Sequence, residues 1–326
     1  MQPPRWLAVL AVAVLALLAV PALAGAAEPP NQNDRCSAAG RNTCGTTGLG
    51  QYDTYRYGLR WFGDYRGAVP GEALTFCIDL RFWYPNPAYR YQPLAAKGLR
   101  NRDGEPVSAV RQQQMAYAMW AYGRSSSPRQ QAAVMLFVHG LMGDGAPGEV
   151  DPAALGPDVV RLYERIARDA ERYHGPYRLR IDMPSKLTVA QRATVGIRVL
   201  SATGRAVPNL RLTLTAAGVQ GLPDELRTNA AGEARVSFVP ATATDVRLTV
   251  KTAVASTLPK LYAASTQPAA RNAQRLAAPS PQELQETVAA PAAPSPLRVT
   301  STAKPNRLLV GEESTCLLYT SDAADD

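Results

Sequence analysis

The residues best suited to chemistry in this sequence are its cysteines. Of the four present, Cys316 falls in a C-terminal segment that is considered separately below. Cys36 and Cys44 flank a short loop rich in Gly, Asn and Thr, and in an oxidising compartment we expect them to form a disulfide. Closing so short a loop stabilises a fold by about 2–3 kcal/mol. Cys77 is then left over, which in an exported protein points to an intermolecular disulfide, a reactive thiol or another covalent bond.

The sequence around Cys77 resembles that of a known family. Phe76-Cys77-Ile78-Asp79 is similar to the aromatic-Cys-aliphatic-Asp motif of the Cys–Gln thioester domains of Gram-positive surface proteins. In that family the cysteine bonds to the glutamine of a Thr-Gln-x-Ala-Ile-Trp motif at the start of a buried helix. Residues 130–135 read Gln-Gln-Ala-Ala-Val-Met, so the resemblance implies Gln131 as the partner. Gln130 replaces the family's Thr and Met135 its Trp, and the resemblance covers about residues 50–175.

A thioester between Cys77 and Gln131 also makes physical sense. A thiolate held in line with a side-chain carboxamide can displace ammonia, provided that water is excluded from the product. Gln131 falls in the first turn of a predicted buried helix, while Gln130 is the capping-box residue of that helix and the alternate partner. Asp79 is a candidate for orienting a group. The candidates for the dry wall around the bond are Phe76, Trp83, Tyr84 and Trp120.

Other interpretations stay open at this point. Cys77 could be a buried core thiol, with the two glutamines on a helix surface. Thr266-Gln267-Pro268-Ala269 fits the glutamine motif literally, but its Pro breaks a helix start. His139-Gly140 resembles part of a hydrolase oxyanion loop, yet no Gly-x-Ser-x-Gly elbow is present, and we interpret His139 as a helix-end residue. No spacing typical of a metal site or a phosphate-binding Gly loop is present, so no cofactor is predicted.

The elements that must position these residues begin after a secretory signal peptide over residues 1–27. Its marks are Arg5, an uncharged apolar run over 6–20, and small residues after Pro21. Residues 28–175 form an aromatic-rich α+β unit, the expected thioester domain. Its three predicted helices span 108–122, 128–142 and 157–173, with Ser108 and Ser127 as N-caps.

Further along the chain, alternating runs and turns such as Asn229 to Gly232 predict an all-β, immunoglobulin-like sandwich over 176–252. The turn resembles that of bacterial immunoglobulin-like repeats in surface adhesins. Residues 253–296, rich in Ala and Pro, are predicted to be a linker with a short helix near 281–288. Residues 297–315 are interpreted as the start of a truncated β domain. Residues 316–326 match the translation of a transposon sequencing adapter, and we expect them to be a scar.

The expected function is inferred from the net charge of the chain and from its predicted export. The net charge of +8 is carried mostly by Arg spread along the chain. We interpret this charge as aiding solubility or weakly attracting anionic cell-wall polymers, and not as nucleic-acid recognition. No transmembrane segment is predicted beyond the signal peptide. The sequence therefore predicts a secreted or surface-anchored, adhesin-like protein that captures an amine, such as a protein lysine, once and without turnover. It is then not an enzyme in the usual sense. The alternative is a non-covalent or structural envelope module with an inactive thioester domain.

Overall fold

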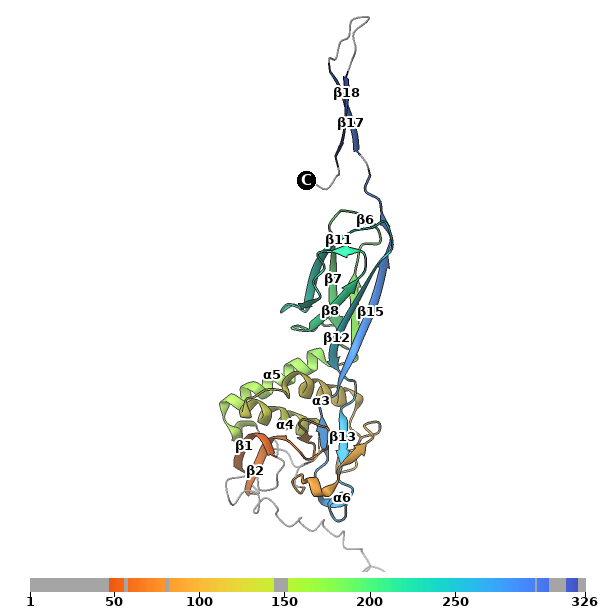
Figure 1. The fold of residues 1–326 in the computed structure, drawn as a ribbon. Helices are drawn as coiled ribbons and strands as arrows, with labels where there is room; N and C mark the ends of the chain where they lie inside the picture. Colours follow the sequence, from red (N-terminus) through yellow and green to blue (C-terminus); the bar gives the residue numbers. More distant parts are fainter. Residues whose placement is uncertain are drawn as a thin grey trace, which may run out of the picture.

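The fold class predicted from the sequence, α+β, is confirmed. The computed structural model describes residues 47–55, 58–79, 82–143, 152–296, 298–304 and 315–321. Three long helices, three short helical turns and several mostly antiparallel sheets make up this part of the chain (Figure 1). The predicted signal peptide, Cys36 and Cys44 lie outside the described residues.

All three predicted helices are confirmed. They are α3 (Ala109–Tyr122), α4 (Pro128–Met142) and α5 (Pro157–Tyr173). Local sequence explains their starts, because Ser108 Oγ accepts from the Arg111 backbone N and Ser127 Oγ accepts from the Gln130 backbone N. α4 is apolar on nearly every face and is buried from Gln131 to His139.

The α-helices pack against two sheets to form a head. The hairpin of β1 (Thr47–Tyr55) and β2 (Gly58–Tyr65) lies against α4. The second sheet has four short strands in the order β3-β14-β13-β4. Their bounds are Phe76–Cys77 for β3, Leu276–Ala278 for β14, Lys260–Ala263 for β13 and Gln92–Leu94 for β4. Short helical turns complete this unit at Pro87–Tyr89 (η1), Pro152–Leu155 (η2) and Ala269–Asn272 (α6).

The sandwich consists of two four-stranded antiparallel sheets, in the orders β5-β7-β11-β9 and β10-β8-β12-β15. Alternation explains the inner face: along β7 the buried positions are every second residue from Ala193 to Val199. The first sheet comprises β5 (Arg178–Asp182), β7 (Ala193–Leu200), β11 (Glu233–Pro240) and β9 (Val219–Gln220). The second comprises β10 (Glu225–Arg227), β8 (Arg211–Ala216), β12 (Val246–Ala255) and β15 (Pro281–Ala290). A small parallel pair joins β6 (Leu187–Thr188) to β16 (Ala292–Ala293).

The turn that resembles those of immunoglobulin-like repeats forms as predicted. Asn229 Oδ1 accepts from the backbone N of Ala231 and of Glu233. Gly232 has a φ of 78°, and a Cβ at this position would stand 2.5 Å from the backbone of Ala206. Only glycine fits both the dihedral angle and the close approach.

The prediction of a linker over 253–296 is wrong. After β12 the chain returns to the head, where β13 and β14 fill the middle of the four-stranded sheet. It then leaves along the sandwich as β15, where a helix was expected, and pairs with β12 over ten residues. The Ala-rich composition suits this role, because small side chains let Ala277 and Ala278 pack with no exposed surface. The head is therefore built from two separate stretches of chain, with strands β5 to β12 of the sandwich between them and its last strand, β15, after the second stretch.

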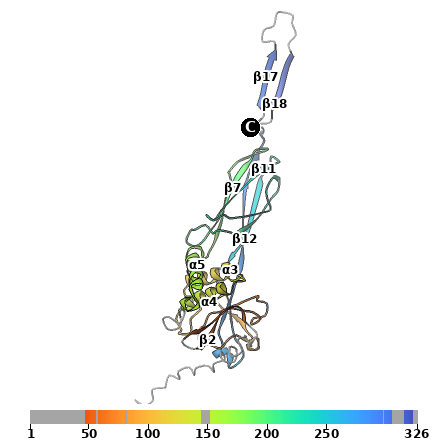
Figure 2. The same ribbon diagram turned by 90° about the vertical axis from the view of Figure 1, so that its left-hand side faces the viewer.

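The described molecule is elongated (Figure 2). The head lies at one end, the sandwich in the middle, and a hairpin of β17 (Arg298–Lys304) and β18 (Thr315–Ser321) beyond it. β18 falls largely within the segment expected to be an adapter scar. Within the described part of the chain, no helix combines the length and apolarity needed to cross a membrane.

Candidate functional site

Cys77 lies in the interior of the head, on the short strand β3. It pairs in register with Leu276 of β14, and its side chain has no exposed surface. Its Sγ lies 2.8 Å from the Asp79 carbonyl oxygen and accepts from the Asp79 backbone N at 3.3 Å. Helix α4 packs against β3. The thiol is thus shielded from solvent, a setting that suits either a stored thioester or an ordinary core thiol.

Gln131 is fully buried in the first turn of α4, where the sequence placed it. Its Nε2 donates to the carbonyl oxygens of Gly123 at 2.8 Å and of Ser125 at 2.6 Å, both in the loop before the helix. Its Oε1 is buried and has no hydrogen-bond partner among the described residues. A buried carbonyl without a partner costs about 1–3 kcal/mol, so this side chain is under-satisfied.

Gln130, the alternate partner, has a different setting. It is only partly buried, and its Nε2 donates to the Tyr122 carbonyl oxygen at 3.1 Å. Its side chain therefore holds the end of α3 instead of closing the predicted capping box on the backbone of Ser127. Of the box, only the bond from the Gln130 backbone N to Ser127 Oγ is seen.

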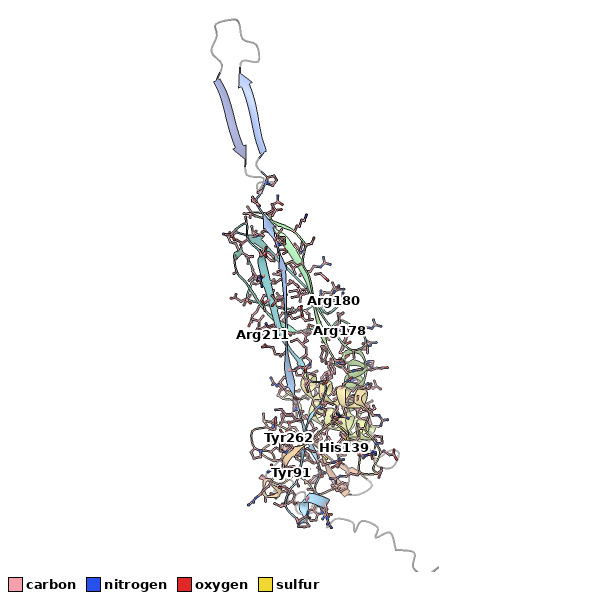
Figure 3. The ribbon with its side chains drawn as sticks, turned by 90° about the vertical axis from the view of Figure 1, so that its right-hand side faces the viewer. Tyr91, His139, Arg178, Arg180, Arg211 and Tyr262 are labelled. Carbon is pink, nitrogen blue, oxygen red and sulfur yellow. The ribbon has the colours of Figure 1, made fainter. Side chains whose placement is uncertain are left out.

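A residue of secondary interest in the sequence, His139, lies next to Cys77. Its imidazole hydrogen-bonds the Cys77 backbone, while its Nε2 is buried without a partner among the described residues. Figure 3 labels His139 within the head. Burial lowers the pKa of His139 to about 4, although the charge of Asp79 and the bond to Cys77 act in the opposite direction. His139 is thus a neutral core residue in the last turn of α4. In the sequence, the feature that could have drawn attention to His139 is its position as a polar residue in the apolar second half of the helix.

The two predicted thioester residues lie near opposite ends of α4. Cys77, on strand β3, is beside the last turn of the helix, and Gln131 is in its first turn. Gln131 and His139 are eight residues apart on one ridge of the helix, a rise of about 12 Å. Cys77 is held at the His139 end, whereas the Gln131 carboxamide is directed to the loop before the helix. The structure thus places both residues in one buried core on contacting elements, each with its own hydrogen bonds.

Asp79 is the centre of a buried charge cluster. Its carboxylate accepts from Arg275 Nη2 at 2.7 Å and Nε at 2.9 Å, and pairs with Arg102 Nη2 at 2.7 Å. Burial alone would raise the pKa of Asp79, but the Arg275 hydrogen bonds and both guanidinium charges outweigh it and hold the pKa below its usual value. Arg102 also stacks over the Phe82 ring at 4.0 Å. Arg275 could not be predicted, because it lies in the segment interpreted as a linker.

The residues predicted to wall off the thioester are in several places. Phe76 is fully buried and faces the Gln131 end, since a Cβ on Gly123 would stand 3.2 Å from its ring. The other three predicted wall residues contact neighbours elsewhere in the head. The Tyr84 hydroxyl accepts from the Trp61 backbone N. The Trp83 ring contacts the Tyr89 ring, and the Trp120 ring contacts the Tyr117 ring. Within the described residues, no group of three or more His, Cys, Asp or Glu side chains could hold a metal ion.

Comparison with known proteins gives a distant likeness. No protein-family model and no curated protein matches the chain. Nine chains among solved structures match, and one of them is FdeC, described as an adhesin of Escherichia coli. The likeness to FdeC has 14% sequence identity and a TM-score of 0.24, and covers 47% of this chain and 44% of that chain. The chain thus spans less than half of FdeC and resembles it only distantly.

Proposed function

We propose that this is a surface-displayed, adhesin-like protein whose head captures an amine-bearing target through a Cys77–Gln131 thioester, with the sandwich as a stalk. The observation that carries the proposal is the state of Gln131. Its carboxamide is fully buried with an unpartnered Oε1, on a helix that packs against the strand of Cys77. Such an under-satisfied group in a dry core calls for an explanation, and a reactive role is one that fits.

The chemistry has two steps. In the first, Cys77 Sγ attacks Gln131 Cδ, the Cδ–Nε2 bond breaks, and the thiol proton leaves with Nε2 as ammonia. In the second, a target amine attacks the same carbon, an amide forms, and Cys77 leaves as a thiolate that takes up the amine's proton. The product is a covalent crosslink and the thioester is not regenerated, so the head acts once.

Formation of the bond replaces contacts present in the described state. Sγ must leave the Asp79 carbonyl, and the carboxamide must turn from the Gly123 and Ser125 carbonyls toward β3. The strand of Cys77 must also shift along α4, because Cys77 is held beside His139, about 12 Å of helix from Gln131. Loss of ammonia removes both donors from that loop. Gln131 Oε1 accepts no hydrogen bond from the described residues, so rotation of the carboxamide breaks no hydrogen bond at this atom.

A second candidate function is non-covalent binding on the same fold. It is favoured by one observation: both donors of Gln131 Nε2 are used to hold the α3–α4 loop. In this case Gln131 is a structural clamp and Cys77 a core thiol, and the head recognises its target by surface contacts alone.

Methylamine distinguishes the two functions. In the covalent case it adds to Gln131 and releases one thiol for alkylation, and both Cys77→Ala and Gln131→Ala abolish the labelling. Gln130→Ala is the matched control, because it alters the neighbouring side chain and is expected to cost only about 1 kcal/mol for the lost hydrogen bond to the Tyr122 carbonyl oxygen. Wild-type protein that takes up no methylamine, with Cys77 open to alkylation on denaturation, supports the non-covalent function.

A further inference from the structure

Helix α5 carries a straight row of arginines on its exposed face. Arg161, Arg165, Arg168 and Arg172 are spaced i, i+4, i+7 and i+11, so they lie within one stripe of the helix about 16 Å long. All four are exposed. The buried residues of the helix, Val159, Ile166 and Ala170, face the head on the other side.

The row continues onto the sandwich. Arg178 and Arg180 come five and seven residues after Tyr173, the last residue of α5, and are exposed on the same face of β5. Figure 3 shows both on one side of the stalk, next to the helices, with Arg211 on the other side. The junction is tight, because the Arg172 carbonyl oxygen accepts from Ser201 Oγ at 2.8 Å and from Thr203 Oγ1 at 2.6 Å. We call these six residues, from Arg161 to Arg180, the arginine track.

The track is richer in positive charge than the chain as a whole. Residues 157–180 hold six Arg and four Asp or Glu, a net charge of +2 over 24 residues, against +8 over the 326 residues of the chain. Two of the acids are turned toward the head, where Asp158 pairs with Arg129 and Asp169 accepts from Tyr122. Among the described residues, ion pairs engage only two of the six track arginines, Arg161 with Asp158 and Arg168 with Glu164.

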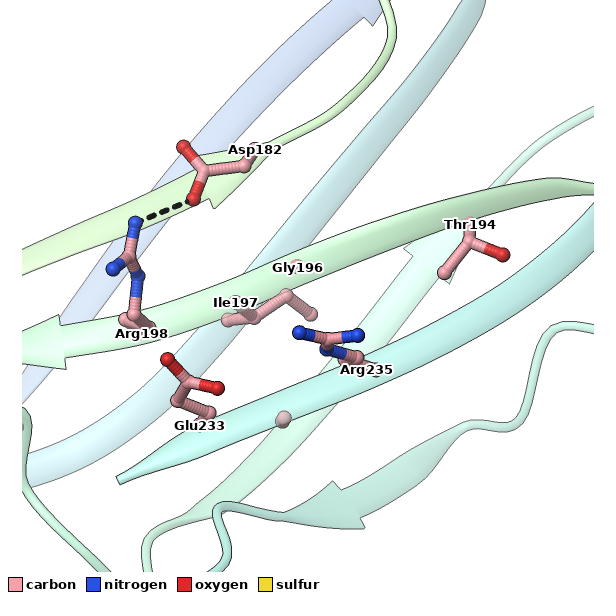
Figure 4. Close-up of a pocket in the computed structure, with 8 residues that line it drawn as sticks. Asp182, Thr194, Gly196, Ile197, Arg198, Glu233 and Arg235 are labelled. Carbon is pink, nitrogen blue, oxygen red and sulfur yellow. Dashed lines mark hydrogen bonds and ion pairs between the residues drawn. The ribbon is translucent and has the colours of Figure 1, made fainter. Parts of the chain in front are cut away.

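A neighbouring hollow of mixed charge lies beside the end of the track, lined by Arg198 and Arg235 and by Asp182 and Glu233. On the outer face of β5, β7 and β11 it has a volume of about 340 Å³, with Gly196 among its lining residues (Figure 4). Arg198, opposite Arg180 in the register of β5 and β7, lines it and pairs with Asp182 at 2.8 Å. Arg198 also lies opposite Glu233 in the register of β7 and β11, so its charge is balanced within the sheet and the track ends at Arg180.

We propose that the arginine track is a docking surface for a linear phosphate-bearing polymer of the cell envelope. Guanidinium groups present planar, forked donors that match phosphate geometry and stay charged at every physiological pH. Their spacing of about 4.5–6 Å along α5 is that of a linear array and not of a single pocket. The surface is independent of Cys77 and Gln131, so it acts whether or not the thioester forms.

Binding of linear polyphosphate, followed by fluorescence anisotropy over a range of salt concentrations, tests the proposal. The proteins are the wild type, a track variant and a control variant of equal net charge. The track variant carries Arg165→Gln, Arg172→Gln and Arg178→Gln. The control carries Arg211→Gln, Arg227→Gln and Arg247→Gln, all on the opposite sheet of the sandwich.

We expect the wild type and the control to bind with similar affinity, and the track variant to bind at least roughly tenfold more weakly. The slope of log affinity against log salt should fall in magnitude by about two units in the track variant, from the loss of three phosphate contacts. Cys77→Ala should bind like the wild type. Equal loss in both triple variants would assign binding to net charge and overturn the proposal. Absence of polyphosphate binding at low salt, or binding only to a sulfated glycan or to anionic vesicles, would overturn it too.

Discussion

The Arg275 guanidinium forms a forked ion pair with the Asp79 carboxylate, although 196 residues separate the two in sequence. The pair fixes the returning segment of the chain beside the strand of Cys77, because the Ile78 backbone N also donates to the Arg275 carbonyl oxygen at 3.0 Å. Asp79 is fully buried and Arg275 is only 14% exposed. The position of Cys77 therefore depends on a contact with a segment that follows strand β12 of the sandwich in the chain.

Loss of Arg275 should destabilise the head strongly. Arg275→Ala leaves Asp79 buried with Arg102 as its remaining ion-pair partner, and we expect a cost of about 3 kcal/mol in the free energy of unfolding. The control is Arg211→Ala, which breaks the solvent-exposed pair with Glu225 and should cost below about 1 kcal/mol. Urea denaturation measures both, and equal costs would contradict a central role for the buried pair.

Removal of the returning segment should expose Cys77. A chain that ends after Ala255 lacks β13, β14 and β15, so β3 loses its partner strand. We expect Cys77 to be alkylated rapidly under native conditions, as read by peptide mass mapping. A chain that ends after residue 296 lacks only β17 and β18 and should keep Cys77 protected. Both truncated chains also carry Gln131→Ala, which prevents a thioester. Protection of Cys77 from alkylation then reports only its burial. Protection in the shorter chain would show that the head folds without β14.

The free energy of unfolding should decrease as the pH is lowered, because His139 titrates. Its pKa is lowered to about 4 in the fold, so between about pH 6.5 and 4 the unfolded chain binds a proton that the folded chain does not. Stability present above pH 6.5 is lost over this window, by about 3 kcal/mol. Asp79, the charged group facing His139, has a lowered pKa and adds its own loss only at lower pH, as it is protonated.

The control for this prediction is His139→Asn, which keeps a donor for the Cys77 carbonyl but does not titrate. Urea denaturation of both proteins at several pH values gives the comparison. The variant should lose much less stability than the wild type between pH 6.5 and 4. The same slope in both proteins would place the pH dependence elsewhere.

The N-terminal cysteines allow a prediction from sequence alone. Cys36 and Cys44 should be joined to each other, since they flank a short polar loop in an exported chain. Peptide mapping without reduction should recover one cross-linked pair. A link from Cys77 to either residue would refute both this pairing and the thioester.

The elements that sequence predicted well are those specified locally. The three helices have Ser or Pro at their starts and apolar residues at helical spacing, and the Asn229 turn needs a glycine at Gly232. The return of the chain to the head could not be predicted in this way. β3 and β14 are two and three residues long and have no periodicity of their own. Their pairing depends on long-range contacts such as Asp79 with Arg275, which no local pattern signals.

For the candidate site, sequence predicted the burial of Gln131 but not its neighbours. The capping serine and apolar helix are local features, so the depth of Gln131 follows from them. The side-chain direction depends on the Gly123 and Ser125 carbonyls, and the height of Cys77 depends on His139 and β14. These are tertiary contacts. The resemblance to thioester domains named the two residues without giving their relative position.

The central claim is tested most directly by the intact mass of freshly purified, secreted protein. The thioester predicts a mass lower by one ammonia than that of the sequence, after correction for the disulfide. The deficit should be present in wild type and in Gln130→Ala, and absent in Cys77→Ala and in Gln131→Ala. A wild-type protein with its full sequence mass, whose Cys77 is alkylated as soon as it is denatured, would contradict the thioester.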